Sequence, residues 1–170
     1  PSGPEGPLII HVSMSVTAAG VVNRLKNAGT PLPHPWLLAK DGEPTDDPEA
    51  LGGGGSILPL GGLDAGYKGY ALGLLVEALT SGLAGFGRSE NPTNWGTSVY
   101  LQVINPEFFG GSGELEREMG WVNHACRSRA PRPGQEAVRM PGDRALALKA
   151  EQLEIGLLLH VGLATGQERQ

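Results

Sequence analysis

Alternation of apolar and polar residues marks two segments of the chain as strands. Residues 7–16 (PLIIHVSMSV) begin with an apolar, β-branched run and then alternate, which predicts a central strand that is buried at one end and ends among polar residues. Residues 97–104 (TSVYLQVI) also alternate and are rich in β-branched and aromatic side chains, so a second strand is predicted there. A short third strand is expected at residues 137–140, after a proline-rich break.

Three other segments carry helical signals. Residues 69–85 are apolar on nearly every side, which predicts a buried core helix with Glu77 at its one exposed or paired point. Beyond Ser112, an apolar stripe recurs every three or four residues: Leu115, Met119, Val122 and Cys126. This stripe predicts an amphipathic helix for which Ser112 can serve as the N-cap. A third helix is expected at about residues 145–154, ahead of a polar tail.

The segment at residues 29–62 is dense in proline, glycine and aspartate, which predicts a long loop of about 35 residues. Loops of that length are uncommon in compact domains unless they bind something, so the loop is a weak pointer to a site. A surface connector is an equally acceptable interpretation. The acidic residues of this segment are most simply explained as the exposed side chains of a solvated loop. A calcium-binding loop would need regularly spaced oxygen ligands and a glycine.

Composition narrows the class of protein. With 27 glycines and 14 prolines among 170 residues, loops must be plentiful, while 39% hydrophobic residues argue against wholesale disorder. A formal charge of −5 offers no general attraction to nucleic acid or to an anionic membrane, and no apolar stretch reaches the roughly 20 residues of a membrane span. The single cysteine and the absence of a signal-peptide pattern point to the cytoplasm. We therefore expect one globular domain over residues 1–170.

Two features of the sequence suggest chemistry. The glycine-rich residues 51–69 lead into the predicted core helix, where free backbone N–H groups and Lys68 would favour a phosphate-bearing ligand; a flexible glycine loop is the alternative. Neither a P-loop nor a Rossmann glycine turn is present. His11, followed by Ser13 and Ser15, is a candidate proton carrier, although such a histidine is more often satisfied in a core. The four histidines and one cysteine share no metal-ligand spacing, so no metal is predicted.

Five segments, taken together and in order, resemble the type 2 malate/L-lactate dehydrogenase family of NAD(P)-dependent 2-oxoacid reductases: PLIIHVSMSV, WLLAKDGEPTDDPEAL, LPLGGLDAGYKGYALGLLVEALTSGL, VINPEFF and RMPGD. The most specific of them contain DGEPTDDP and GYKGYALGLLVE, because unusual residue types recur there at fixed spacing. Members of this family are about twice as long as this chain, which resembles their second half. Their first half holds the histidine thought to donate the substrate proton.

The resemblance implies an α/β (mixed α+β) fold, namely a non-Rossmann cofactor-binding domain with a mixed, largely antiparallel sheet flanked by helices. It also implies a homodimer that binds NAD or NADP near the subunit boundary. Carried over by position, the cofactor contacts fall on a strand end, on an aromatic–cation pair and on the residues after a proline turn. These residues are His11, Val12, Ser13, Met14, Ser15, Val16, Thr17, Tyr67, Lys68, Gly142, Asp143 and Arg144. In this scheme Lys68 pairs with phosphate and Asp143 holds ribose hydroxyls.

The chain departs from the family pattern at two of these positions. His11 stands where the family usually has an aspartate, which reverses the expected charge and puts turnover in question. Tyr67 stands where histidine is more common, and an aromatic ring is kept. We expect an oxidoreductase that passes a hydride between nicotinamide and the C2 carbonyl of a small 2-oxo acid such as pyruvate or oxaloacetate. By itself the chain is expected to be inactive; the alternative is a non-catalytic relative that serves as a cofactor-binding or dimerisation module.

Overall fold

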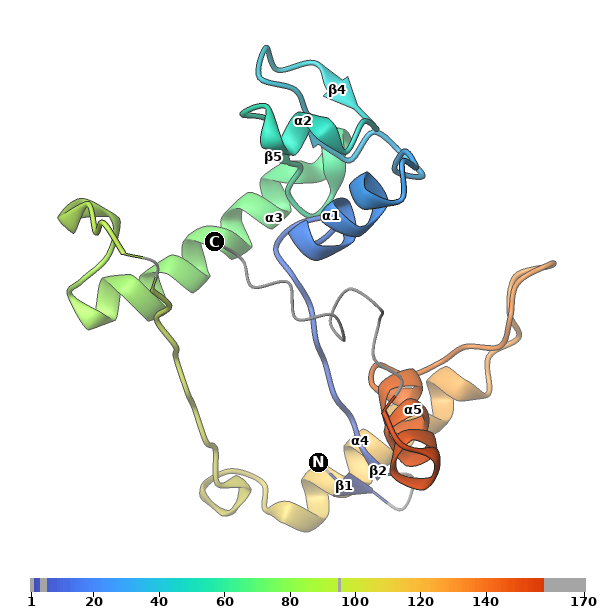
Figure 1. The fold of residues 1–170 in the computed structure, drawn as a ribbon. Helices are drawn as coiled ribbons and strands as arrows, with labels where there is room; N and C mark the ends of the chain where they lie inside the picture. Colours follow the sequence, from blue (N-terminus) through green and yellow to red (C-terminus); the bar gives the residue numbers. More distant parts are fainter. Residues whose placement is uncertain (1, 4–5, 95, 158–170) are drawn as a thin grey trace. The chain divides into compact units, whose positions relative to one another are not determined.

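The computed structural model has a mixed α/β architecture, in which helices accompany short antiparallel strands (Figure 1). The residues that the structure describes are 2–3, 6–94 and 96–157. The chain divides into two compact units: unit 1 comprises residues 1–11 with 104–170, and unit 2 comprises residues 12–103. The mixed α/β class predicted from the sequence is confirmed. No helix in the described part of the chain is long and apolar enough to cross a membrane.

Unit 2 contains a three-stranded antiparallel sheet at the place where the sequence predicted a long loop. Strand β3 (Leu37–Leu38) lies between β4 (Pro44–Thr45) and β5 (Ser56–Ile57), and the short helix α2 (Glu49–Gly52) connects the two outer strands. The prediction of a structureless loop is therefore wrong. Strands of two residues are too short to show an alternating pattern, and the prolines and glycines around them dominate the local signal.

The buried core of unit 2 lies between this segment and the helix before it. Val22 of helix α1 (Ala19–Asn27) and Leu37 of β3 are fully buried, and Leu32 joins them. Figure 1 shows α1 and α2 gathered beside the sheet, whose strand β5 adds Ile57 to this cluster. The core is therefore formed by α1 and by the proline-rich segment after it rather than by the predicted core helix.

Helix α3 (Gly62–Glu77) begins earlier than predicted and continues into the π-helical turn η1 (Ala78–Gly82). The prediction that this helix is buried is wrong, because Leu74 is 53% exposed and Leu75 is 54% exposed. Of the residues of α3, all of which the structure describes, Gly69 is the buried one. An apolar surface on every side of a helix needs neighbours on every side, and the described residues cover only the part near Gly69. The remainder of unit 2 includes the 3-10 turn η2 (Arg88–Glu90).

The strands predicted at residues 7–16, 97–104 and 137–140 are wrong in large part. Within 7–16, strand β2 reaches Pro7 and Ser15 forms an isolated antiparallel bridge with Pro59, while residues 8–14 pair with no described strand. Residues 97–104 and 137–140 have no strand structure. Alternation predicts an extended segment with one apolar face, but a strand also needs a continuous partner for its backbone groups. In the described part of the chain, residues 97–104 and 137–140 pair with no strand, and residues 7–16 pair only at their two ends.

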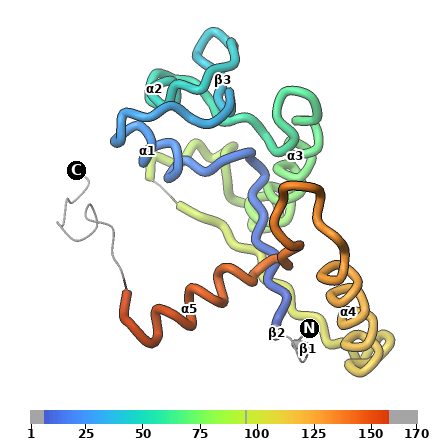
Figure 2. Tube along the Cα trace, turned by 90° about the vertical axis from the view of Figure 1, so that its right-hand side faces the viewer, coloured from blue at the N-terminus to red at the C-terminus, as the bar shows by residue number. Residues whose placement is uncertain are grey.

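Unit 1 consists of a small hairpin and two long helices. Strands β1 (Ser2–Gly3) and β2 (Gly6–Pro7) pair antiparallel, and the 3-10 turn η3 (Pro106–Phe108) precedes helix α4 (Ser112–Arg127). Figure 2 shows α4 and α5 (Asp143–Ile155) as separate helices. Both helices confirm the sequence prediction. The predicted polar tail lies outside the described residues.

The N-terminus of α4 is capped differently from the prediction. The residue that precedes the helix is Gly111, and Ser112 is the first helical residue. Its backbone N–H and its hydroxyl both donate to the Glu107 carboxylate, at 3.0 and 2.6 Å. These two hydrogen bonds stabilise the charged form and hold the pKa of Glu107 below its ordinary value. Glu107 therefore supplies the acceptor that the sequence assigned to Ser112, and its negative charge suits a helix amino end.

Candidate functional site

Unit 1 contains a groove of about 1080 Å³ that brings together three of the predicted site residues: His11, Gly142 and Arg144. Its wall combines apolar side chains, among them Ile9, with the guanidinium-bearing Arg139, which the sequence analysis did not single out. Arg139 stands directly before the proline turn, where nothing in its local pattern marks it as a site residue.

The turn at residues 140–143 shapes this groove. Gly142 has φ +102°, a left-handed conformation that glycine adopts without steric cost, and the Asp143 N–H donates to the Met140 carbonyl at 3.1 Å. The Ile9 N–H donates to the Pro141 carbonyl at 3.2 Å, and a Cβ on Gly142 would lie 2.9 Å from the Ile9 Cβ. Gly142 thus allows the segment that carries His11 to approach the turn closely.

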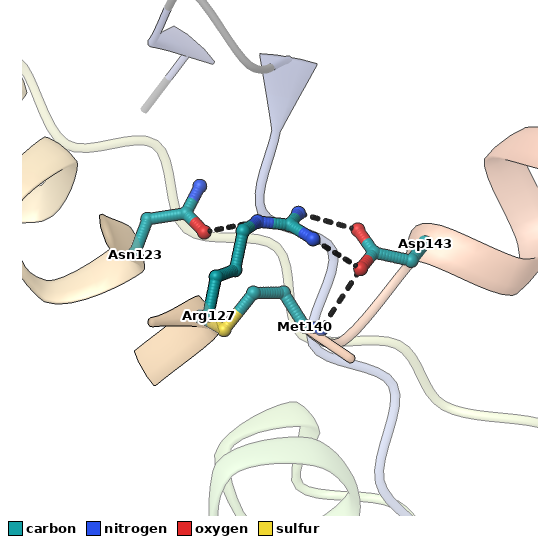
Figure 3. A network of polar contacts seen from close by, with 4 residues as sticks. All are labelled: Asn123, Arg127, Met140 and Asp143. Atoms are coloured by element: carbon teal, nitrogen blue, oxygen red, sulfur yellow. Dashed lines mark hydrogen bonds and ion pairs between the residues drawn. The ribbon is translucent and has the colours of Figure 1, made fainter. Parts of the chain in front are cut away.

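Asp143 opens α5 and is held by a network of polar contacts (Figure 3). Arg127 of α4 donates to both carboxylate oxygens at 2.8 Å, and the Met140 N–H donates to Oδ2 at 2.9 Å. The Arg127 Nε–H donates in turn to the Asn123 side-chain oxygen at 2.8 Å. The Arg127 bonds first, then the Met140 N–H and the positive charge of Arg139, hold the pKa of Asp143 below its ordinary value. Asp143 is therefore an ionised anchor for the start of α5.

This network bears on the predicted role of Asp143. Three hydrogen bonds occupy most of the acceptor positions of its carboxylate, leaving one on Oδ1 for a further donor. The ribose role of Asp143 stays a prediction, and the structure adds a partner that sequence reasoning missed. The available signal was the placement of Arg127 in the last turn of a predicted helix, but the sequence does not show what lies opposite it.

The predicted strand-end residues 12–17 lie in unit 2, where their polar groups are partly used within the chain. The Ser13 and Ser15 hydroxyls lie 2.8 Å apart, and the Ser15 hydroxyl donates to the Thr17 carbonyl at 2.8 Å. The Val16 N–H donates to the Leu58 carbonyl at 3.0 Å. This pairing holds the strand end in a defined position.

Tyr67 and Lys68 lie on α3 in the same unit. The Lys68 Nζ is 5.9 Å from the centre of the Tyr67 ring, and both side chains are exposed. The next residue, Gly69, donates its N–H to the Leu60 carbonyl at 3.0 Å, and Leu60 in turn donates to the Met14 carbonyl at 2.7 Å. Unit 2 thus brings the strand end and the aromatic–cation pair into one neighbourhood.

The structure modifies the expected glycine-rich phosphate site. Helix α3 begins at Gly62, so Lys68 lies well inside the helix rather than beside its free N–H groups. Gly55 has a packing role, because a Cβ there would lie 2.3 Å from the Leu38 carbonyl oxygen. Among the residues that the structure describes, no group of three or more His, Cys, Asp or Glu side chains is placed to hold a metal ion.

The described residues thus combine a mixed α/β fold with a groove whose lining includes Arg139 and Arg144. A protein-family model described as malate/L-lactate dehydrogenase matches residues 1–165. The chain therefore belongs to the malate/L-lactate dehydrogenase family, as the resemblance predicted.

Relatives with known names cover most of this chain. It is 37% identical over 156 residues to the (2R)-3-sulfolactate dehydrogenase (NADP(+)) of Chromohalobacter salexigens, covering 87% of this chain and 43% of that enzyme. It is 36% identical over 156 residues to a Δ1-pyrroline-2-carboxylate/Δ1-piperideine-2-carboxylate reductase of Pseudomonas putida. This match covers 85% of this chain and 41% of that enzyme. The chain thus spans less than half the length of either enzyme.

A solved structure confirms the likeness in fold. The malate dehydrogenase of Entamoeba histolytica superposes with a TM-score of 0.82 at 21% sequence identity. The match covers 97% of this chain and 50% of that structure. At this level of identity the comparison speaks for the fold alone.

Proposed function

We propose that this chain is part of an NAD(P)-dependent oxidoreductase that acts on a small 2-hydroxy or 2-oxo acid. The observation that carries the proposal is the family match over residues 1–165. The sulfolactate, malate and pyrroline-carboxylate enzymes named above share one substrate feature, a carboxylate beside the carbon that is oxidised or reduced. The proposed substrate is therefore this class, of which malate and lactate are members.

The described residues fit the dinucleotide in volume and charge. The groove of about 1080 Å³ is slightly larger than the roughly 300–1,000 Å³ of most small-molecule pockets, and the guanidinium groups in its lining suit a phosphate-bearing ligand. When bound, the nicotinamide supplies or takes up the hydride. In this chain Lys68 and Arg144 would hold phosphate groups, and the exposed Tyr67 ring would pack on a flat face of the ligand. The segment from His11 to Thr17 would orient the nicotinamide and its ribose.

Further parts of the proposal concern the whole protein. We infer a non-Rossmann cofactor domain, a homodimer and a cytoplasmic location, each carried from the sequence resemblance or composition. Self-association is supported by the exposed apolar residues of the extended segment 97–104, among which Leu101 is 84% exposed. The same exposure supports the alternative, a cofactor-binding or dimerisation module without catalysis.

The test is a fluorescence titration of the folded 170-residue chain with NADPH and with NADH. We expect saturable binding by at least one of them, and Lys68→Ala should weaken it by about 1.5–3 kcal/mol if Lys68 forms a charge-assisted hydrogen bond. Lys40→Ala removes the same charge from another exposed position of unit 2 and should leave the affinity nearly unchanged. Absence of binding by both nucleotides at millimolar concentration, in a sample with helical circular dichroism, would contradict the proposal.

Turnover separates the enzyme from the non-catalytic module. The chain should be assayed with NADPH and a panel of 2-oxo acids, alone and together with the remaining portion of a family member. We expect no turnover by the chain alone. Turnover on addition of that portion would support the oxidoreductase. Cofactor binding without turnover, both by the chain alone and after the addition, would support the non-catalytic module.

A further inference from the structure

One face of helix α3 packs within unit 2. A Cβ on Gly69 would lie 2.2 Å from the Leu60 nitrogen, and a Cβ on Gly73 would lie 3.3 Å from the Met14 sulfur. These glycines mark the side on which α3 lies against the segments before it. From there the helix extends away from the short strands and from α1 and α2 of the same unit (Figure 1).

The opposite face of α3 is apolar and exposed. It consists of Tyr70, Ala71, Leu74, Leu75 and Ala78, and is named the outer face. At 3.6 residues per turn these positions form one stripe, centred on the side of the helix opposite Gly69. Ala78, which follows α3, keeps helical backbone angles, so the stripe continues to it. Tyr70 is 64% exposed, Leu74 and Leu75 are about as exposed, and both alanines are exposed as well.

The shape of the outer face favours a second helix as its partner. Ala71 and Ala78 lie seven residues apart, about two turns, and the larger Leu74 stands between them. A helix along this face would place large apolar side chains over the alanines and small ones beside Leu74, as in the packing of ridges into grooves. At the edge of the face, Glu77 is paired with Arg88 at 3.3 Å, so an apolar partner can approach without burying an unpaired carboxylate.

The size of the outer face favours a partner from the same polypeptide over a separate molecule. The face extends over about 12 Å of a helix that is about 10 Å wide with its side chains. This strip is far smaller than the roughly 800 Å² that each partner of a stable complex buries. A segment of the same polypeptide needs no such area, because its covalent connection keeps its effective concentration high.

The relatives are long enough to supply such a segment. The chain spans 43% of the sulfolactate dehydrogenase of Chromohalobacter salexigens and 50% of the malate dehydrogenase structure of Entamoeba histolytica. We propose that the outer face of α3 is the docking surface for an amphipathic helix from the portion of the family's longer chain that lies outside these 170 residues. The proposal rests on family membership and on the exposure of α3, and is independent of the proposed cofactor chemistry.

The test co-expresses this chain, carrying an affinity tag, with the portion of the C. salexigens enzyme that the match leaves out. We expect the two to co-purify, and Leu74→Glu to lower the recovered portion at least about tenfold, because it puts a charge in the centre of an apolar contact. Leu153→Glu makes the same change at a 78% exposed position of α5 and should alter the recovery less than about twofold. Absence of co-purification with the wild-type chain, or equal recovery with both variants, would overturn the proposal.

Measurements on the chain alone exclude the other occupants. If the outer face is free in the isolated chain, Leu74→Glu should shift the midpoint of urea denaturation by less than about 0.3 M, as Leu153→Glu does. A much larger loss for Leu74→Glu would mean that this chain already covers the face itself, and would overturn the proposal. Light scattering addresses a second copy: a dimer that Leu74→Glu converts to a monomer would assign the face to self-association instead.

Discussion

Replacing Gly69 by alanine tests the packing that holds α3 against the predicted site. The added Cβ would lie 2.2 Å from the Leu60 nitrogen, 2.6 Å from its carbonyl oxygen and 2.7 Å from the Met14 carbonyl oxygen. All three atoms are backbone, so relief requires α3 to move, at a cost of about 1–3 kcal/mol for overpacking. The movement would also weaken the hydrogen bonds of Gly69 and Leu60, each worth about 0.5–1.5 kcal/mol.

Alanine in place of a helical glycine gains about 0.5–1 kcal/mol, which offsets part of this cost. The net loss for Gly69→Ala is therefore about 2–4 kcal/mol. In urea denaturation followed by circular dichroism, a slope of about 2 kcal/mol per molar converts this loss into a midpoint lower by about 1–2 M. Because Lys68 is the adjacent residue, the affinity for NADPH should fall as well.

Gly20→Ala is the matched control for this experiment. Gly20 lies in α1 of the same unit, and a Cβ there would meet no atom within 4 Å. The substitution should leave the free energy of unfolding unchanged or raise it by up to about 1 kcal/mol, and the midpoint should follow. If Gly69→Ala also raises the midpoint, the close approach of α3 to Met14 and Leu60 is incorrect, and the reasoning about the position of Lys68 fails with it.

Two further predictions concern the core and the ion pair at the start of α5. Leu37→Ala, at a fully buried position, should cost about 2–5 kcal/mol in thermal denaturation, whereas Leu101→Ala, at a position 84% exposed, should stay within about 0.5 kcal/mol; equal losses would contradict the placement of the core. Arg127 holds the pKa of Asp143 in the folded protein below the ordinary value of 3.8. The ion pair therefore stabilises the folded state fully at pH values above 3.8, and this contribution is lost as the pH falls through the lower pKa of the folded state. The stability difference between the wild type and Asp143→Asn should therefore shrink in acid, and a difference that is independent of pH would be evidence against the ion pair.

Local patterns predicted the helices of unit 1 well. The stripe from Leu115 to Cys126 and the helix near residues 145–154 are signalled by neighbours three or four positions apart, and the structure has α4 and α5 there. The strands failed because a strand depends on its partner, which the sequence pattern does not identify. The sheet around Leu37 was missed because each of its strands has two residues.

Sequence reasoning reached part of the candidate site. The family resemblance placed His11, Gly142 and Arg144 among the cofactor contacts, and the structure places them around one groove. Arg127 and Arg139 were missed because their significance depends on the fold. Arg127 meets Asp143 across 16 positions of sequence, and Arg139 gains its setting from the turn that follows it.

Each unit uses a glycine to position a candidate phosphate-binding cation. In unit 2, Gly69 lets α3 pack closely against the backbone of Leu60 and Met14, beside Lys68. In unit 1, Gly142 stands two residues before Arg144 and lets Ile9 approach the turn. In both cases an added Cβ would lie too close to its neighbour, so either that neighbour or the segment that carries the cation would have to move. Such a displacement is costly for a charged contact, because the strength of a hydrogen bond to an ionised group depends steeply on distance and angle. Gly69, which belongs to the glycine-rich stretch that suggested a phosphate site, therefore contributes through packing, by fixing where Lys68 stands.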